Sequence, residues 1–152
     1  MNKFSECEEI GRYKFLQQIS GTCHNIRFTQ NQYDKVDVFW EHGLSSNVGE
    51  IKYRSGYTSD NKYIAEQGAV LEKTKYDALN YYSVASGITP YYIMIFADDK
   101  IAIFNLNKIK NIEFKNELYK YPKTTCGDNR RVEKEVTYLP LSLAKIVNLK
   151  YS

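Results

Sequence analysis

The segment from Val36 to Arg54, VDVFWEHGLSSNVGEIKYR, predicts a β-hairpin. Residues 36–40 and 48–53 are rich in β-branched and aromatic side chains, which favours strands. Gly43, two serines and Asn47 lie between them, and this composition is typical of a connecting loop. We therefore expect the two strands to lie side by side in one sheet.

Three charged residues of this hairpin indicate a metal-binding site. Glu50 and Lys52 lie two positions apart on one strand, so their side chains project from the same face of the sheet. Asp37 lies on the preceding strand, and the hairpin brings it beside them. Two carboxylates completed by water molecules are a common way to bind Mg²⁺. The segment therefore predicts a metal site with an ammonium group next to it.

A second Glu-x-Lys match, Glu113-Phe114-Lys115, lacks this context. Its upstream acids, Asp98 and Asp99, fall in a predicted turn, and no long helix follows it. Because Glu and Lys are common, about one such match is expected by chance in a chain of this length. We therefore choose Glu50 and Lys52 as the functional pair and treat Glu113 as a decoy.

The rest of the chain predicts one mixed α+β domain that spans residues 1–152. A helical stripe of Ile64, Leu71, Ala78 and Tyr82 predicts one long helix from the loop at 55–60 to about Ala85. The other predicted elements are helices at 3–19 and 141–147, strands at 24–29, 91–97, 101–105 and 132–139, a turn at 31–34 and a loop at 124–129.

The motif and the element order resemble the PD-(D/E)xK nuclease superfamily, which includes type II restriction enzymes and archaeal Holliday-junction resolvases. Asp37 in Val-Asp-Val-Phe-Trp matches the first acid, and Glu50-Ile51-Lys52 matches the second part of the motif. The resemblance covers roughly residues 3–105, with 106–152 as a C-terminal elaboration. Lys35-Val36 stand where the family's proline would stand. The resemblance implies a restriction-endonuclease-like αβββαβ core, in which helices flank a central mixed sheet.

The resemblance also implies a Mg²⁺- or Mn²⁺-dependent endonuclease that hydrolyses DNA phosphodiester bonds. Asp37, Glu50 and the carbonyl of Ile51 would hold the ion. Lys52 would orient or deprotonate the attacking water and offset charge on the phosphate. No covalent enzyme intermediate is needed.

Further site residues follow from the same resemblance. Many members carry an acid on the first helix that faces the metal, and Glu8 is our choice, ahead of Glu9 and Glu6. Early-helix acids also suit the helix dipole, so Glu8 has a structural alternative. Some members place a glutamine on the helix after the lysine, where Gln67 lies. The predicted DNA-contacting residues are Tyr53, Arg54, Lys62, Lys73 and Lys75.

Composition limits the remaining classes. The net charge of +3 and the pI of about 8.6 are compatible with nucleic-acid binding but do not require it. The chain lacks an apolar run of the roughly 18 residues that a membrane span requires. Its acidic N-terminus does not resemble a signal peptide, so we expect a cytoplasmic protein. Cys7, Cys23 and Cys126 predict neither a disulfide framework nor a zinc ribbon.

Two alternatives remain open from the sequence. The first is a catalytically inactive module of the same fold that binds nucleic acid or protein. The second is an unrelated α+β domain in which Glu50 and Lys52 belong to a solvated strand face. Within the nuclease hypothesis, the small size favours a structure-directed, resolvase-like enzyme acting as a homodimer.

Overall fold

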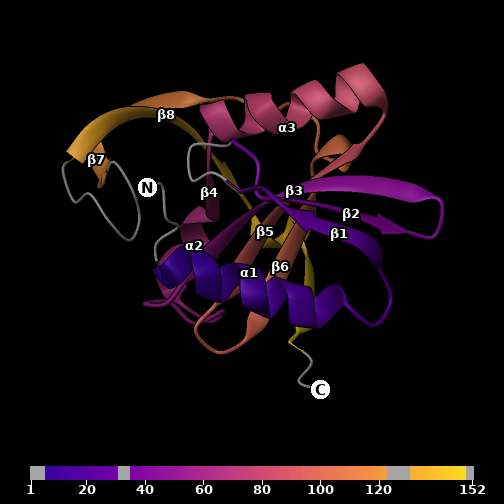
Figure 1. The fold of residues 1–152 in the computed structure, drawn as a ribbon. Helices are drawn as coiled ribbons and strands as arrows, with labels where there is room; N and C mark the ends of the chain where they lie inside the picture. Colours follow the sequence, from indigo (N-terminus) through magenta and orange to yellow (C-terminus); the bar gives the residue numbers. More distant parts are fainter. Residues whose placement is uncertain (1–5, 31–34, 123–130, 150–152) are drawn as a thin grey trace.

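The computed structural model describes residues 6–30, 35–122 and 131–149. Figure 1 shows a central sheet that lies between α1 (Glu6–Ile19) and α3 (Lys73–Ser86). Among the helices in these ranges, none combines the length and apolar character that crossing a membrane requires. The remaining helical elements are α2 (Lys62–Gln67) and the 3₁₀ turns η1 (Leu106–Lys108) and η2 (Leu141–Leu143).

The central sheet has the strand order β1-β2-β3-β5-β6-β9. Its strands are β1 (His24–Phe28), β2 (Val38–His42), β3 (Ser45–Arg54), β5 (Thr89–Phe96), β6 (Lys100–Asn105) and β9 (Lys145–Asn148). The predicted hairpin is β2–β3, which pairs antiparallel from Val38 opposite Gly49 to His42 opposite Ser45. Strands β3 and β5 are parallel and the other pairs are antiparallel, so the sheet is mixed as expected.

The single long helix expected from residue 61 to Ala85 is wrong. Helix α2 ends at Gln67, the strand β4 (Ala69–Glu72) follows, and α3 begins at Lys73. Gly68 has φ +90° and ψ 179°, a conformation that no helix can continue through. Strand β4 pairs with β8 (Arg131–Leu139), which pairs with β7 (Lys115–Pro122), so residues far along the chain build a second sheet. These tertiary backbone hydrogen bonds override the local helical stripe.

The helix expected at 141–147 is also wrong. Only a 3₁₀ turn forms there, and β9 then pairs antiparallel with β6, with Val147 opposite Ile101. The open edge of β6 supplies backbone partners that a short isolated helix would not have. Cys7 is disulfide-bonded, which the cysteine spacing did not predict, whereas Cys23 is free. The turn predicted at 31–34 and the loop at 124–129 lie outside the described residues.

Two apolar cores lie on the two faces of the central sheet. On the α1 side, Phe15 contacts Trp40 edge to face at 5.1 Å between ring centroids, and Ile51 belongs to the same core. On the α3 side, Leu79 and Val48 belong to the other core. Because side chains alternate along a strand, Glu50 and Lys52 share the face of Val48. The candidate site therefore lies on the α3 side of the sheet.

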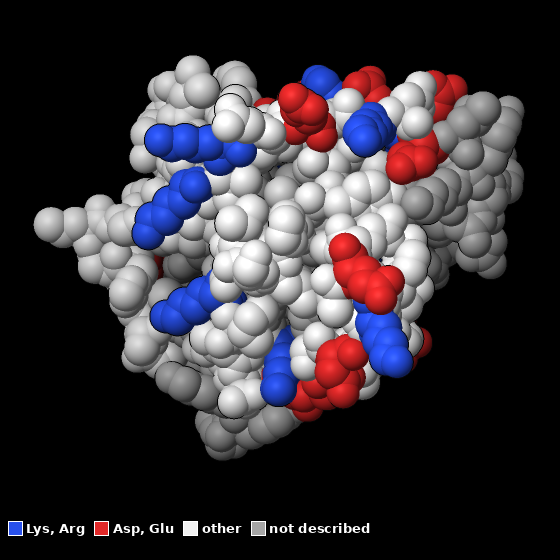
Figure 2. All heavy atoms as spheres, turned by 180° about the vertical axis from the view of Figure 1, so that it is seen from behind, with Lys and Arg blue, Asp and Glu red and all other residues white. Residues whose placement is uncertain are grey.

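Charge is unevenly distributed over the surface. The face seen from behind in Figure 2 carries basic side chains along one side and a mixture of acidic and basic side chains along the other. The centre of this face, as far as it is described, shows few charged groups. Although the net charge is +3, the face seen in Figure 2 is not uniformly basic.

Gly68 offers a test of the β4 insertion. A Cβ atom at this position would lie 2.6 Å from the backbone oxygen of Leu139, and φ is already +90°. Gly68→Ala should therefore lower the free energy of unfolding by about 1–3 kcal/mol, measured by urea denaturation. Gly21→Ala is the control, because its Cβ would meet no atom within 4 Å. Equal stability of the two variants would contradict the observed end of α2.

Candidate active site

Asp37 lies directly before β2, where pairing between β2 and β3 ends. Its backbone N–H donates to the Gly49 carbonyl at 2.9 Å, and its Oδ2 accepts the Ile51 N–H at 2.7 Å. The side chain thus supplies a hydrogen-bond acceptor to β3 beyond the end of β2, on the edge of β3 that does not pair with β5. An Asp within an apolar run is disfavoured as a strand residue. Here it serves as the cap of an open strand edge.

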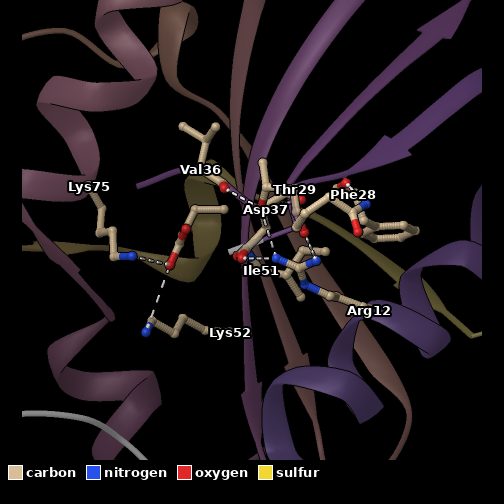
Figure 3. A network of polar contacts seen from close by, with 10 residues as sticks. Arg12, Phe28, Thr29, Val36, Asp37, Ile51, Lys52 and Lys75 are labelled. Carbon is tan, nitrogen blue, oxygen red and sulfur yellow. Dashed lines mark hydrogen bonds and ion pairs between the residues drawn. The ribbon is translucent and has the colours of Figure 1, made fainter. Parts of the chain in front are cut away.

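Arg12 of α1 holds Asp37 from the other side (Figure 3). Its Nη2 lies 3.0 Å from Asp37 Oδ1, and the guanidinium also donates to the carbonyl and hydroxyl oxygens of Thr29 at 2.7 and 3.0 Å. The same group lies over the Phe28 ring, 5.5 Å from its centroid. Asp37 therefore has a fixed orientation. Sequence reasoning missed Arg12, because nothing local marks a helix residue that contacts a loop 25 positions away.

Glu50 is almost fully buried, with 2% of its surface exposed. Its Oε1 lies 3.3 Å from Lys75 Nζ and 3.8 Å from Lys52 Nζ. Figure 3 shows these two ammonium groups approaching from α3 and from β3. Burial is the largest cause and the negative charge of Asp37 the second, and they raise the pKa of Glu50 to about 8. The structure therefore brings Asp37, Glu50 and Lys52 together and adds Lys75 to them.

The ammonium group of Lys75 belongs to this network electrostatically. Burial alone would lower the pKa of Lys75, but the negative charges of Glu50, Asp37 and Glu72 outweigh that effect. The pKa is therefore raised above its ordinary value, and the group stays charged at neutral pH. The sequence placed Lys75 among the expected DNA contacts, whereas the structure places it against a carboxylate of the site.

The donor set fits a hard divalent cation. Glu50 Oε2 is buried and has no hydrogen-bond partner among the described residues, although an unpartnered buried carboxylate oxygen is costly. Asp37 lies next to it. The N–H and C=O of one strand residue point to the same side, so the Ile51 carbonyl faces the same open edge as its N–H. Carboxylate and carbonyl oxygens are ligands that Mg²⁺ and Mn²⁺ accept.

A third acid does not join the two carboxylates in the part of the chain that the structure describes, where no group of three His, Cys, Asp or Glu could hold a metal ion. Glu6, Glu8 and Glu9 are exposed on the first turn of α1. Glu8 lies one helical turn before Arg12 and so on the same side of α1. It is Arg12 that contacts Asp37, and a metal-binding role for Glu8 stays a prediction.

The other predicted site residues have no contact with Asp37 or Glu50 among the described hydrogen bonds and ion pairs. Gln67 ends α2, and its buried Oε1 has no hydrogen-bond partner among the described residues, so its role also stays a prediction. Tyr53 lies on the α1 side of β3, where Lys14 contacts its ring. Lys62 is exposed at the start of α2, and Lys73 forms a surface ion pair with Asp77 at 2.7 Å.

Arg54 ends β3 and has the same strand parity as Glu50 and Lys52, so it lies on the α3 side. Burial raises the pKa of Tyr92. The positive charge of Arg54 and a hydrogen bond from its side chain act in the opposite direction, toward a lower pKa. Arg54 therefore contacts a buried residue of the neighbouring strand. Its predicted contact with DNA remains a prediction.

The decoy motif is not assembled into a site. Glu113 is exposed in the segment before β7, and Phe114 packs against the Tyr76 ring. Asp98 accepts hydrogen bonds from Ser59, and Asp99 pairs with Lys14. The acids upstream of the decoy thus have separate partners.

Comparison with solved structures finds a similar fold in Archaeoglobus fulgidus Hjc, a Holliday junction resolvase from an archaeal hyperthermophile. The likeness has a TM-score of 0.52 and 10% sequence identity, and it covers 88% of this chain and 93% of that one. No protein-family model and no curated protein matches the sequence. At this identity, the likeness establishes the fold. The resemblance inferred from the motif is confirmed at that level: the chain has the mixed α+β fold of the PD-(D/E)xK nuclease superfamily.

Proposed function

We propose that this protein is a metal-dependent endonuclease that hydrolyses DNA phosphodiester bonds. The observation that carries the proposal is the buried, incompletely partnered carboxylate of Glu50 beside Asp37, with Lys52 and Lys75 next to it. Placing such a group in a protein interior is costly unless a cation completes it. Asp37, at the open edge of β3, lies next to Glu50 and Lys52 on the α3 side, which supports the proposed chemistry.

Each residue has a role that its position supports. Asp37, Glu50 and the Ile51 carbonyl would hold Mg²⁺ or Mn²⁺, which polarises the phosphate and lowers the pKa of a bound water. Arg12 and the Ile51 N–H keep the Asp37 carboxylate in place. The Lys52 ammonium donates a hydrogen bond to the attacking water and offsets charge that develops on the phosphate. The water oxygen forms a bond to phosphorus and gives up a proton to solvent, while the bond to the leaving oxygen breaks and that oxygen takes up a proton from solvent.

The substrate class follows from the fold by analogy. The neighbouring structure is a Holliday junction resolvase, and the likeness covers 93% of that chain. That likeness supports a structure-directed enzyme that acts on branched DNA. The homodimer, the single domain over residues 1–152 and the cytoplasmic location stay predictions.

Three substitutions test the cleavage chemistry. Asp37→Asn and Glu50→Gln remove a charge from the cation site, and Lys52→Ala removes the motif ammonium. Each should reduce the rate of Mg²⁺-dependent cleavage of linear and four-way-junction DNA by about 100- to 1,000-fold. DNA binding should persist, because phosphate contacts elsewhere supply most of the affinity. The measurement is single-turnover cleavage alongside binding of the same DNA.

Glu113→Gln is the matched control and should cleave at the wild-type rate, because Glu113 is exposed and outside the site. Loss of cleavage in this variant together with full activity of Glu50→Gln would identify the decoy as the true motif. A wild-type protein that binds DNA but cleaves none with Mg²⁺ or Mn²⁺ would favour the inactive binding module.

Cation binding should be visible without DNA. Millimolar Mg²⁺ or Mn²⁺ should raise the melting temperature, because an ion that binds only the folded site stabilises it by mass action. Ca²⁺ should also raise it but support little cleavage, since its looser coordination positions water poorly. Glu50→Gln should lose this response. If none of the three ions changes the melting temperature, a cation site at Asp37 and Glu50 is contradicted.

The burial of Glu50 predicts how metal-free stability changes with pH. Its pKa is raised from 4.5 to about 8 on folding, so its stabilising contribution is complete below pH 4.5 and is lost as pH rises through 8. In EDTA, wild-type stability should therefore fall relative to Glu50→Gln between pH 5 and 9, by about 3–5 kcal/mol. Denaturation at several pH values measures the difference. Parallel pH profiles of the two proteins would show that Glu50 ionises normally.

A further inference from the structure

Lys75 differs from the other predicted DNA contacts in what it touches. Its Nζ lies 3.3 Å from Glu50 Oε1, which is closer than the 3.8 Å of the motif residue Lys52. Both ammonium groups approach the same carboxylate oxygen, while Oε2 has no hydrogen-bond partner in the described part of the chain. Lys75 therefore contacts the same carboxylate oxygen as Lys52, but from helix α3 and not from strand β3.

The fold directs Lys75 inward. It lies on the first turn of α3, four residues before Leu79, which is fully buried against the sheet, so the two side chains share one helix face. Strand β4 ends at Glu72 and fixes where α3 begins. Lys73, two residues earlier, lies on the surface and pairs with Asp77. The inward position thus belongs to Lys75 in particular.

The side chain is still open to a large ligand. Lys75 is 25% exposed and Lys52 is 23% exposed, whereas the Glu50 side chain between them is 3% exposed. The side chains of both lysines are therefore more accessible to a large anion than the carboxylate that they contact. Two carboxylates here face Arg12, Lys52 and Lys75, so the positive charge already exceeds the negative charge without a cation.

We propose that Lys75 is a second phosphate-binding ammonium of the candidate active site, paired with Lys52 at Glu50 Oε1. The proposal rests on the proposed function for its ligand, a DNA phosphate. When a divalent cation neutralises the two carboxylates, Glu50 no longer requires both lysines. The two ammonium groups then bind the phosphate group that lies in the site, Lys52 from β3 and Lys75 from α3.

The alternative is that Lys75 only neutralises the buried Glu50. The two roles differ once Glu50 has lost its charge. If Lys75 only neutralises Glu50, then Lys75→Gln has no effect on DNA binding in a Glu50→Gln background. A lysine that contacts phosphate weakens DNA binding when it is removed from either background.

A double-mutant comparison of DNA affinity tests this. Lys75→Gln, Glu50→Gln and the double variant are titrated with linear duplex and four-way-junction DNA in millimolar Ca²⁺ over a range of salt concentrations. Lys75→Gln should weaken binding about eightfold at about 0.1 M salt in both backgrounds, and should reduce the slope of log K against log salt by about 1. Lys75→Arg, which keeps the charge, should restore most of the affinity.

Lys145→Gln is the matched control, because it removes the same charge from an exposed position on β9, at the far edge of the sheet from β1. An effect of Lys75→Gln no larger than that of Lys145→Gln, or one that vanishes in the Glu50→Gln background, would overturn the proposal. Circular dichroism and melting curves confirm that each variant is folded. Because binding is measured in Ca²⁺, which supports little cleavage, failure of the wild type to cleave DNA with Mg²⁺ or Mn²⁺ would overturn the proposed function without deciding this result.

Discussion

The buried carboxylate of Glu50 is the constraint around which the site is organised. A carboxylate that is 2% exposed needs positive charge or a proton, because desolvation of an isolated charge is expensive. The chain supplies two ammonium groups on Oε1 and none on Oε2, and it places a second carboxylate, Asp37, close enough to raise the pKa of Glu50 further. The metal-free arrangement is therefore stabilised incompletely, as expected of a site that a cation completes.

Both layers that cover the central sheet contribute to this arrangement. From one face, α1 sends Arg12 to Asp37, and its packing is fixed by the contact of Phe15 with Trp40. From the other face, α3 sends Lys75 to Glu50. Strand β3 lies between the two layers, and its parallel pairing with β5 leaves its other edge to Asp37. Helix packing and the geometry of the proposed cation site are thus determined by the same contacts.

The local part of this site could be predicted from the sequence, and the non-local part could not. The β2–β3 hairpin and the shared face of Glu50 and Lys52 follow from composition and strand periodicity over fewer than twenty residues. Strand β4 could not be predicted, because its partner β8 lies more than sixty positions later and gives the segment 69–72 its extended form. The stripe that includes Leu71 fits a helix equally well. The sequence predicts Lys75 only as a DNA contact, because no local pattern marks its contact with Glu50, which joins α3 to β3.

Arg12 determines how a cation can share the two carboxylates. Asp37 already has a partner on each oxygen, the guanidinium on Oδ1 and the Ile51 N–H on Oδ2, so a cation gains little by replacing either one. Glu50 Oε2 has none among the described residues, and it therefore offers the largest gain in free energy on cation binding. Asp37 has spare lone pairs and can add a cation without releasing Arg12. In the proposed site, Glu50 would thus be the primary anchor of the cation, and Asp37 would be a pre-positioned second ligand.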